Sequence, residues 1–158
     1  MGILTNLSRF SASATSAVLL IVPSTNAWAG NWIRAAGSDN YVFGVDTTTI
    51  RDSSGVKTAW LVVVPKRPAT LGDRVTQYDY YVTRRSFDCD AETMMELTAT
   101  YYRFDESTPL DTDNPVPKVQ YLIPDTTGAH QLESVCYALK LPGVETAEDF
   151  ARLVAQEQ

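Results

Sequence analysis

Two long runs of alternating residues meet at a turn around Cys89, and this arrangement constrains the fold more than any other feature of the sequence. Residues 75–87 and 93–104 are both rich in tyrosine, threonine and other strand-forming residues. A period of two places successive side chains on opposite faces of a strand. We therefore expect two strands joined at residues 88–92. A helix over residues 91–97 is the competing interpretation, but the Thr-Ala-Thr-Tyr-Tyr sequence that follows favours a strand.

The rest of the chain has the pattern of an α+β domain. Residues 56–64 carry apolar side chains at both alternating sets of positions, which predicts a central strand covered on both faces. Shorter strands are expected at residues 31–34, 41–46 and 119–123. With the two long runs, the pattern predicts an antiparallel sheet of five to seven strands followed by C-terminal helical packing.

Two helices are predicted near the C-terminus. The first would be capped by Asp125 or Thr126 and run to about Leu139. Its expected buried face contains Leu132, Val135, Cys136 and Leu139. The second would begin at Thr146, with Asp149 three residues later as in a capping box. Its expected apolar face contains Phe150, Leu153 and Val154.

The first 29 residues have the pattern of an export signal. Arg9 is the only charged residue before Arg34, and the apolar run 17–22 ends at Pro23. Ala27-Trp28-Ala29 supplies a small-x-small cleavage site, which predicts a signal peptide over residues 1–29 and a single domain over 30–158. The apolar run is far shorter than the roughly 20 residues of a membrane-spanning helix. An uncleaved amphipathic helix is the alternative.

Two cysteines, Cys89 and Cys136, are present in this predicted exported chain. In an oxidising compartment such a pair most often forms one disulfide, which here would tie the sheet to the first helix. A reactive thiol pair is the alternative, although the close Cys-x-x-Cys spacing is absent. With no cysteine near the cleavage site, we expect a periplasmic or extracellular protein without a lipid anchor.

Charge and residue inventory disfavour several functions. The formal net charge is -6, which disfavours nucleic acid and anionic lipid as partners. His130 is the only histidine, so no His-based metal site or nucleophile–base pair is visible. Acidic residues crowd the loop 105–114, but their spacing differs from that of a calcium loop. We expect no enzyme activity, no metal and no cofactor.

Tyrosine and arginine on the two long strands are the best binding candidates. These residue types commonly anchor protein interfaces. Alternation places Tyr80 and Tyr81 on opposite faces, so one of them could remain exposed while the other joins the core. The candidate binding residues are Tyr78, Tyr80, Tyr81, Arg84, Arg85, Tyr101, Tyr102 and Arg103.

In this order, the segments resemble the surface-adhesin protein E family. The resemblance lies in Trp32, the run 40–46 ending in Asp, the run 56–60 ending in Trp, residues 85–89 ending in the first cysteine, Tyr101 or Tyr102, and Pro124 followed by Cys136. The family consists of small exported bacterial domains with an antiparallel sheet and helical packing, and its founding members bind host matrix and serum proteins. The resemblance therefore implies a non-enzymatic protein that engages protein ligands through an exposed sheet face or edge. A periplasmic accessory protein that binds another component of the bacterial envelope is the alternative.

Overall fold

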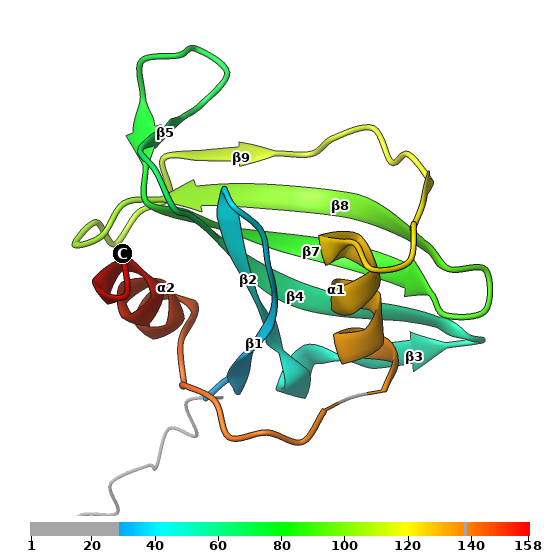
Figure 1. Cartoon of the computed structure of the whole chain (residues 1–158). Helices are drawn as coiled ribbons and strands as arrows, with labels where there is room; N and C mark the ends of the chain where they lie inside the picture. Colours follow the sequence, from blue (N-terminus) through cyan, green and yellow to red (C-terminus); the bar gives the residue numbers. More distant parts are fainter. Residues whose placement is uncertain (1–28, 138) are drawn as a thin grey trace, which may run out of the picture.

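The structure, a computed structural model, describes residues 29–137 and 139–158. Its centre is an eight-stranded antiparallel sheet (Figure 1). The strands are β1 (Trp32–Gly37), β2 (Tyr41–Asp46), β3 (Arg51–Ser53), β4 (Val56–Pro65), β7 (Tyr80–Asp88), β8 (Thr93–Tyr102), β9 (Asp111–Asp113) and β10 (Gln120–Tyr121). A separate pair, β5 (Ala69–Thr70) and β6 (Gln77–Tyr78), forms a small flap. Two helices follow, α1 (Thr127–Cys136) and α2 (Ala147–Gln156).

The sheet has the order β1-β2-β4-β7-β8-β10, with β3 beside β4 and β9 beside β8. β2 and β3 pair with different parts of β4 and are separated by a 3-10 turn at Thr47–Thr49. The buried Asp46 carboxylate caps this turn by accepting the Thr48 N–H at 3.0 Å. Pro115 and Pro117 lie between β9 and β10, where they cannot donate to a ladder. These interruptions explain why the predicted count of five to seven strands is too low.

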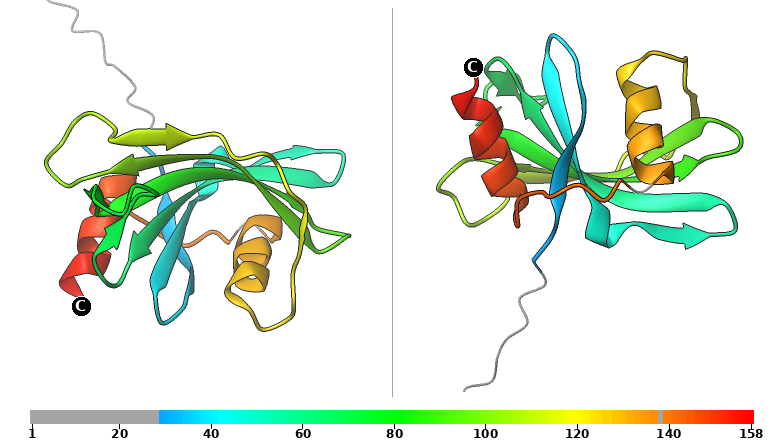
Figure 2. Two further views of the ribbon diagram at one scale, coloured as in Figure 1. Left: turned by 90° about the horizontal axis from the view of Figure 1, so that it is seen from above. Right: turned by 60° about the horizontal axis from the view of Figure 1, so that its bottom comes forward.

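The two helices pack on opposite faces of the β1–β2 hairpin, which lies between them in both views of Figure 2. α2 buries Phe150, Ala151 and Val154 against Trp32 and Val62. Gly44 permits this contact, because a Cβ there would lie 2.8 Å from the Phe150 ring. α1 buries Val135 against a second cluster on the other face, made of Ile33, Val45, Ala59, Leu61 and Phe87.

The helix caps follow the predicted chemistry. The Thr126 side chain accepts the Ala129 N–H at the start of α1, and the Thr146 side chain accepts the Asp149 N–H at the start of α2. Two predicted apolar-face residues differ. Leu139 lies beyond the end of α1 and is exposed, and Leu153 is 48% exposed because α2 turns Ala151 toward the core instead.

The disulfide between Cys89 and Cys136 is present and joins the turn after β7 to the end of α1. Residues 93–102 form a strand rather than the competing helix. The long strand predicted over 75–87 is divided, because Asp79 leaves the ladder and accepts the Phe104 N–H at 2.7 Å. The predicted signal peptide lies outside the described residues except for Ala29. Within the described part of the chain, no helix is long and apolar enough to cross a membrane.

Candidate functional site

The eight predicted binding residues do not form one site. Cross-strand register places Tyr81, Tyr101 and Arg85 on the face that carries α1, and Tyr80, Tyr102 and Arg84 on the opposite face. Arg103 lies just past the end of β8, donates to the Gln77 carbonyl at 3.0 Å and pairs with Glu106. The structure therefore distributes these residues over separate environments.

The first environment is a cluster of aromatic rings on the α1 face, made of Tyr41, Phe43, Tyr78, Tyr81 and Tyr101 and called here the tyrosine cluster. The Tyr78 ring contacts the Tyr81 and Tyr101 rings edge-on, with centroids 6.0 and 5.0 Å away. Burial raises the pKa of the Tyr81 phenol to about 12 and also raises the pKa of Tyr78 and Tyr101. These phenols therefore stay protonated near neutral pH and cannot act as bases. Their mutual packing gives the cluster mainly a structural role.

Tyr80 and Tyr102 occupy the second environment, near α2. Their rings stack 5.2 Å apart, and Tyr80 is 5% exposed. Phe104 stacks on the other side of Tyr80, and the Arg152 guanidinium of α2 lies 4.7 Å from the centre of the Phe104 ring. Tyr80 therefore belongs to the core, with Tyr102 and Phe104 packed around it.

Arg85 is the centre of a buried polar network between the sheet and α1. Its guanidinium donates to the Glu96 carboxylate at 2.6 and 3.1 Å and to the Gln131 side-chain oxygen at 2.6 Å. The Thr83 hydroxyl donates to the same Glu96 oxygen at 3.1 Å. Nε, Nη1 and Nη2 of Arg85 each donate to a protein partner, so Arg85 helps to hold α1 against the sheet.

The fourth environment is the outer face, which we define as the part of β4 around Thr58 and Trp60, with the β3, β7 and β8 residues beside it, on the side opposite α1. It contains Thr58, Trp60, Arg84, Met95 and Thr98, together with Arg51 of β3. α1 packs on the opposite side of the sheet, against Leu61 and Phe87. α2 packs on the same side as Trp60 but farther along the strands, against Val62, Val64 and Tyr80. Trp60 pairs directly with Arg84, and both line a shallow groove with Arg51, Thr49, Thr58 and Ala59.

Arg84 is exposed on this face and forms no ion pair with any residue that the structure describes. Trp60 beside it is half-buried, with part of its indole packed toward the core. Sequence reasoning included Arg84 but not Trp60 or Arg51. The alternation of β4 does predict that Trp60 and Thr58 share a face. The sequence does not show which residues of β3 and β7 pair with them, so Arg51 and Arg84 could not be placed beside Trp60.

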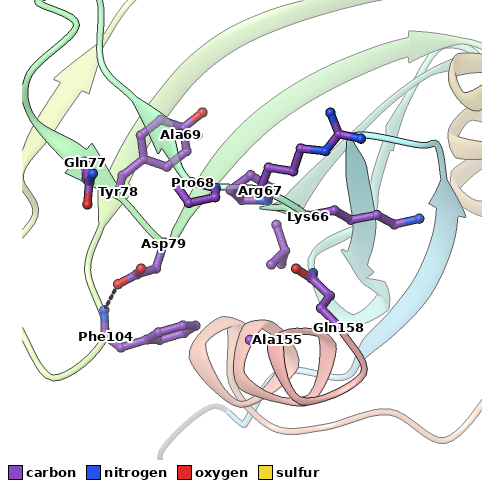
Figure 3. A pocket seen from close by; sticks show the side chains of 12 residues that line it. Lys66, Arg67, Pro68, Ala69, Gln77, Tyr78, Asp79, Phe104, Ala155 and Gln158 are labelled. Carbon is purple, nitrogen blue, oxygen red and sulfur yellow. Dashed lines mark hydrogen bonds between the residues drawn. The ribbon is translucent and has the colours of Figure 1, made fainter.

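A second pocket, of about 260 Å³, lies between the end of β4, the flap and the end of α2. Figure 3 shows that the Lys66 and Arg67 side chains extend away from Asp79 and Phe104. The Asp79 carboxylate, which faces the pocket, already accepts the Phe104 N–H. The pocket lining combines proline, alanine and aromatic surface with Lys66, Arg67 and two glutamines, and no hydrogen bond or ion pair joins Asp79 to either of these cations.

Metal and catalytic chemistry have little support in the described residues. No group of three or more histidine, cysteine or acidic side chains in this part of the chain could hold a metal ion. His130 is exposed on α1, and its Nδ1 lies 3.4 Å from the Glu133 carboxylate. Among the described hydrogen bonds, no nucleophile contacts the His130 imidazole, and the Ser134 hydroxyl donates to the His130 backbone carbonyl instead.

Comparison with known proteins identifies the family. The family model described as surface-adhesin protein E matches residues 32–137, which is more than half of the 158 residues. This chain belongs to the surface-adhesin protein E family. A search of curated proteins found no match. The chain is therefore adhesin-like, and the family is generally non-enzymatic.

Solved structures of Haemophilus influenzae protein E are similar in fold. Crystal form II is 14% identical, with a TM-score of 0.54 over 68% of this chain and 87% of that chain. Protein E from a non-typeable strain is also 14% identical, with a TM-score of 0.52 over 87% of this chain and 96% of that one. At this identity the likeness establishes the shared fold, and it leaves the binding residues to be argued from this chain's own surface.

Proposed function

We propose that this protein E family member is an exported, non-enzymatic binding protein that engages a protein ligand through its outer face. The single observation that carries the proposal is the pairing of half-buried Trp60 with exposed Arg84, which forms no ion pair with a described residue, in a groove that no residue of α1 or α2 lines. Trp and Arg are enriched among the residues that dominate binding energy in protein interfaces.

The edge of the sheet extends this surface. β10 is the last strand in the sheet order, and Tyr121 there is 82% exposed. Tyr121 pairs with Thr93, which in turn pairs with Asp88, so the Tyr121 side chain lies on the same side of the sheet as Trp60. An extended ligand segment could use this edge by strand addition while other parts contact the outer face.

Binding to an array of purified extracellular-matrix and serum proteins tests the proposal. We expect the protein to bind at least one arrayed protein and the Trp60→Ala variant to lose at least tenfold in affinity. Leu153→Ala is the matched control, because Leu153 is a half-exposed apolar residue on α2 that does not line the groove. Equal binding by Trp60→Ala and wild type would contradict the assignment to the outer face.

Cell fractionation of the producing bacterium tests the location. Surface display together with array binding would support adhesion. Protein confined to the periplasm, with capture of an envelope component that depends on Trp60, would replace adhesion by the accessory function and keep the outer face as the binding surface.

A further inference from the structure

We infer that the outer face binds an acidic, extended segment of a partner protein, with carboxylates pairing to Arg51 and Arg84 on either side of Trp60. This inference deepens the proposed function and rests on it. The groove is lined by Thr49, Arg51, Thr58, Ala59, Trp60 and Arg84. Two of these six side chains are cationic and none is acidic, although the whole chain has a net charge of -6.

The two arginines are placed to act together. Arg51 of β3 pairs with Thr58 of β4, and Arg84 of β7 pairs with Trp60 of β4. Thr58 and Trp60 are two residues apart on one strand, so all four side chains lie on one side of the sheet. β3 and β7 flank β4, and the partners of the two arginines are two residues apart on β4, which separates the two arginine backbones by about 12 Å.

The guanidinium groups have capacity for a ligand. The Arg51 Nη1 donates to the Thr48 and Ile50 carbonyls, both at 2.9 Å, which fixes the position of this side chain. Neither Arg51 nor Arg84 forms an ion pair with a carboxylate among the described residues. Arginine binds carboxylates with two parallel hydrogen bonds, so each could accept one acidic side chain.

The spacing suggests the pattern of the ligand. In an extended chain, residues two apart lie about 7 Å from each other and residues three apart lie about 10 Å from each other. Two acidic residues separated by one or two positions would therefore reach both arginines. An apolar or aromatic residue between them would lie over the Trp60 ring, where aromatic contact adds to binding.

A polyanion such as a sulfated polysaccharide or a nucleic acid fits this face less well. Such polymers are bound by long tracks of cations, and their affinity grows with the number of charges neutralised. The groove offers only two cations, and the net charge of -6 repels a long polyanion. A short acidic peptide segment matches the available charge and the indole surface between the cations.

Selection from a library of displayed 12-residue peptides tests the inference, with the folded wild-type protein as the bait. We expect enrichment of sequences with two acidic residues one or two positions apart and an aromatic or aliphatic residue between them. Binding of the selected peptides should fall at least tenfold in Arg84→Gln and again in Arg51→Gln. Lys66→Gln is the matched control, since Lys66 is an exposed cation outside the groove.

The possible outcomes separate this inference from the proposed function. Selected peptides that depend on Trp60 but are neutral or basic would overturn the acidic ligand and leave the outer face as the binding surface. Peptides that depend on neither Trp60 nor the arginines would contradict both. Binding of heparin that depends on Arg84, without enrichment of any peptide that depends on Arg84, would also overturn the inference. Unchanged denaturant midpoints of the arginine variants show that the variants are folded.

Discussion

Arg84 and Arg85 are neighbours on β7, yet their side chains have opposite roles. Arg85 points to the α1 side, where its side chain is 8% exposed and contacts Glu96 and Gln131. Arg84 points to the outer face and forms no ion pair with a described residue. On one side of the strand the arginine side chain binds other residues of the fold, and on the other side it is exposed and could bind a ligand.

The tryptophans repeat this contrast. Trp32 is 8% exposed and packs with Phe150 of α2, whereas Trp60 is half-buried in the outer groove. Where α1 and α2 pack on the sheet, aromatic packing, an ion pair and a disulfide are already satisfied. On the outer face, the same kinds of side chain keep capacity for a partner. Stability and binding should therefore respond to different members of each pair.

The largest expected effect comes from Trp32→Ala. Removing a buried indole leaves a cavity, and large-to-small aromatic substitutions in cores cost up to about 5 kcal/mol. We expect this loss in the free energy of unfolding measured with urea. Trp60→Ala should cost less than half as much, because part of the Trp60 ring already contacts solvent. Equal losses would remove the distinction between the buried tryptophan and the one in the groove.

Loss of the disulfide is expected to have the next largest effect. Cys89 and Cys136 are 47 residues apart, and the chain-entropy model gives about 4 kcal/mol for a loop of this length. In the Cys89→Ser/Cys136→Ser variant, amide exchange should accelerate more in α1 than in α2. α1 buries Val135 as its one fully buried apolar residue and relies on the disulfide and on Arg85, whereas α2 buries three apolar residues. Equal acceleration in both helices would contradict this reasoning.

Arg85→Ala should cost roughly 2–3 kcal/mol, because it leaves Glu96 and Gln131 without their partner. The estimate lies below that for a fully buried pair, since the Glu96 side chain is 29% exposed. Arg84→Ala is the matched variant and should change stability by less than about 0.5 kcal/mol. Urea unfolding of the two variants measures the difference directly. A large loss in Arg84→Ala would show that the outer face is also structural.

The smallest expected effect concerns the helix caps. Thr126→Ala and Thr146→Ala each remove a side-chain acceptor from a helix N-terminus and should cost about 1 kcal/mol. The Thr146 variant should lose more, because its cap bond is shorter (3.0 Å against 3.4 Å). Its hydroxyl also donates to the charged Asp149 carboxylate, whereas that of Thr126 donates to the neutral Ile123 carbonyl. Thermal unfolding followed by circular dichroism compares them. A larger loss for Thr126 would reverse our assessment of which helix depends more on local capping.

Local patterns were enough to predict much of the fold. Alternation identified β4, β7 and β8, and Thr126 and Thr146 marked the starts of both helices because their cap chemistry depends on neighbours three residues away. The pairing of Cys89 with Cys136 followed from their number and the predicted compartment. The sequence did not predict the turn after Asp46. The Asp46 carboxylate ends the strand by accepting the Thr48 N–H, and the sequence alone does not show that this side chain turns back toward the backbone.

The candidate site was harder to predict. Alternation correctly placed Tyr80 and Tyr81, and Arg84 and Arg85, on opposite faces. It could not predict which face of the sheet each helix would cover. That choice depends on contacts such as Phe150 with Val62 and Val135 with Leu61, which join residues far apart in the chain. A bulge at Leu97 of β8 also shifts the pairing, so that Arg84 pairs with Thr98 but Arg85 pairs with Glu96. The sequence did not predict this bulge. Trp60 and Arg51 were therefore not grouped with Arg84.

Fluorescence quenching of Trp60 tests most directly the claim that the outer face is open and positively charged. Iodide and caesium quench exposed indoles with similar mechanisms but opposite charge, and the difference between them is screened by salt. The component of the signal that disappears in Trp60→Phe should be quenched more strongly by iodide than by caesium. This preference should vanish in the Arg51→Gln/Arg84→Gln variant. A Trp60 component that resists both ions, or that prefers caesium, would contradict the account.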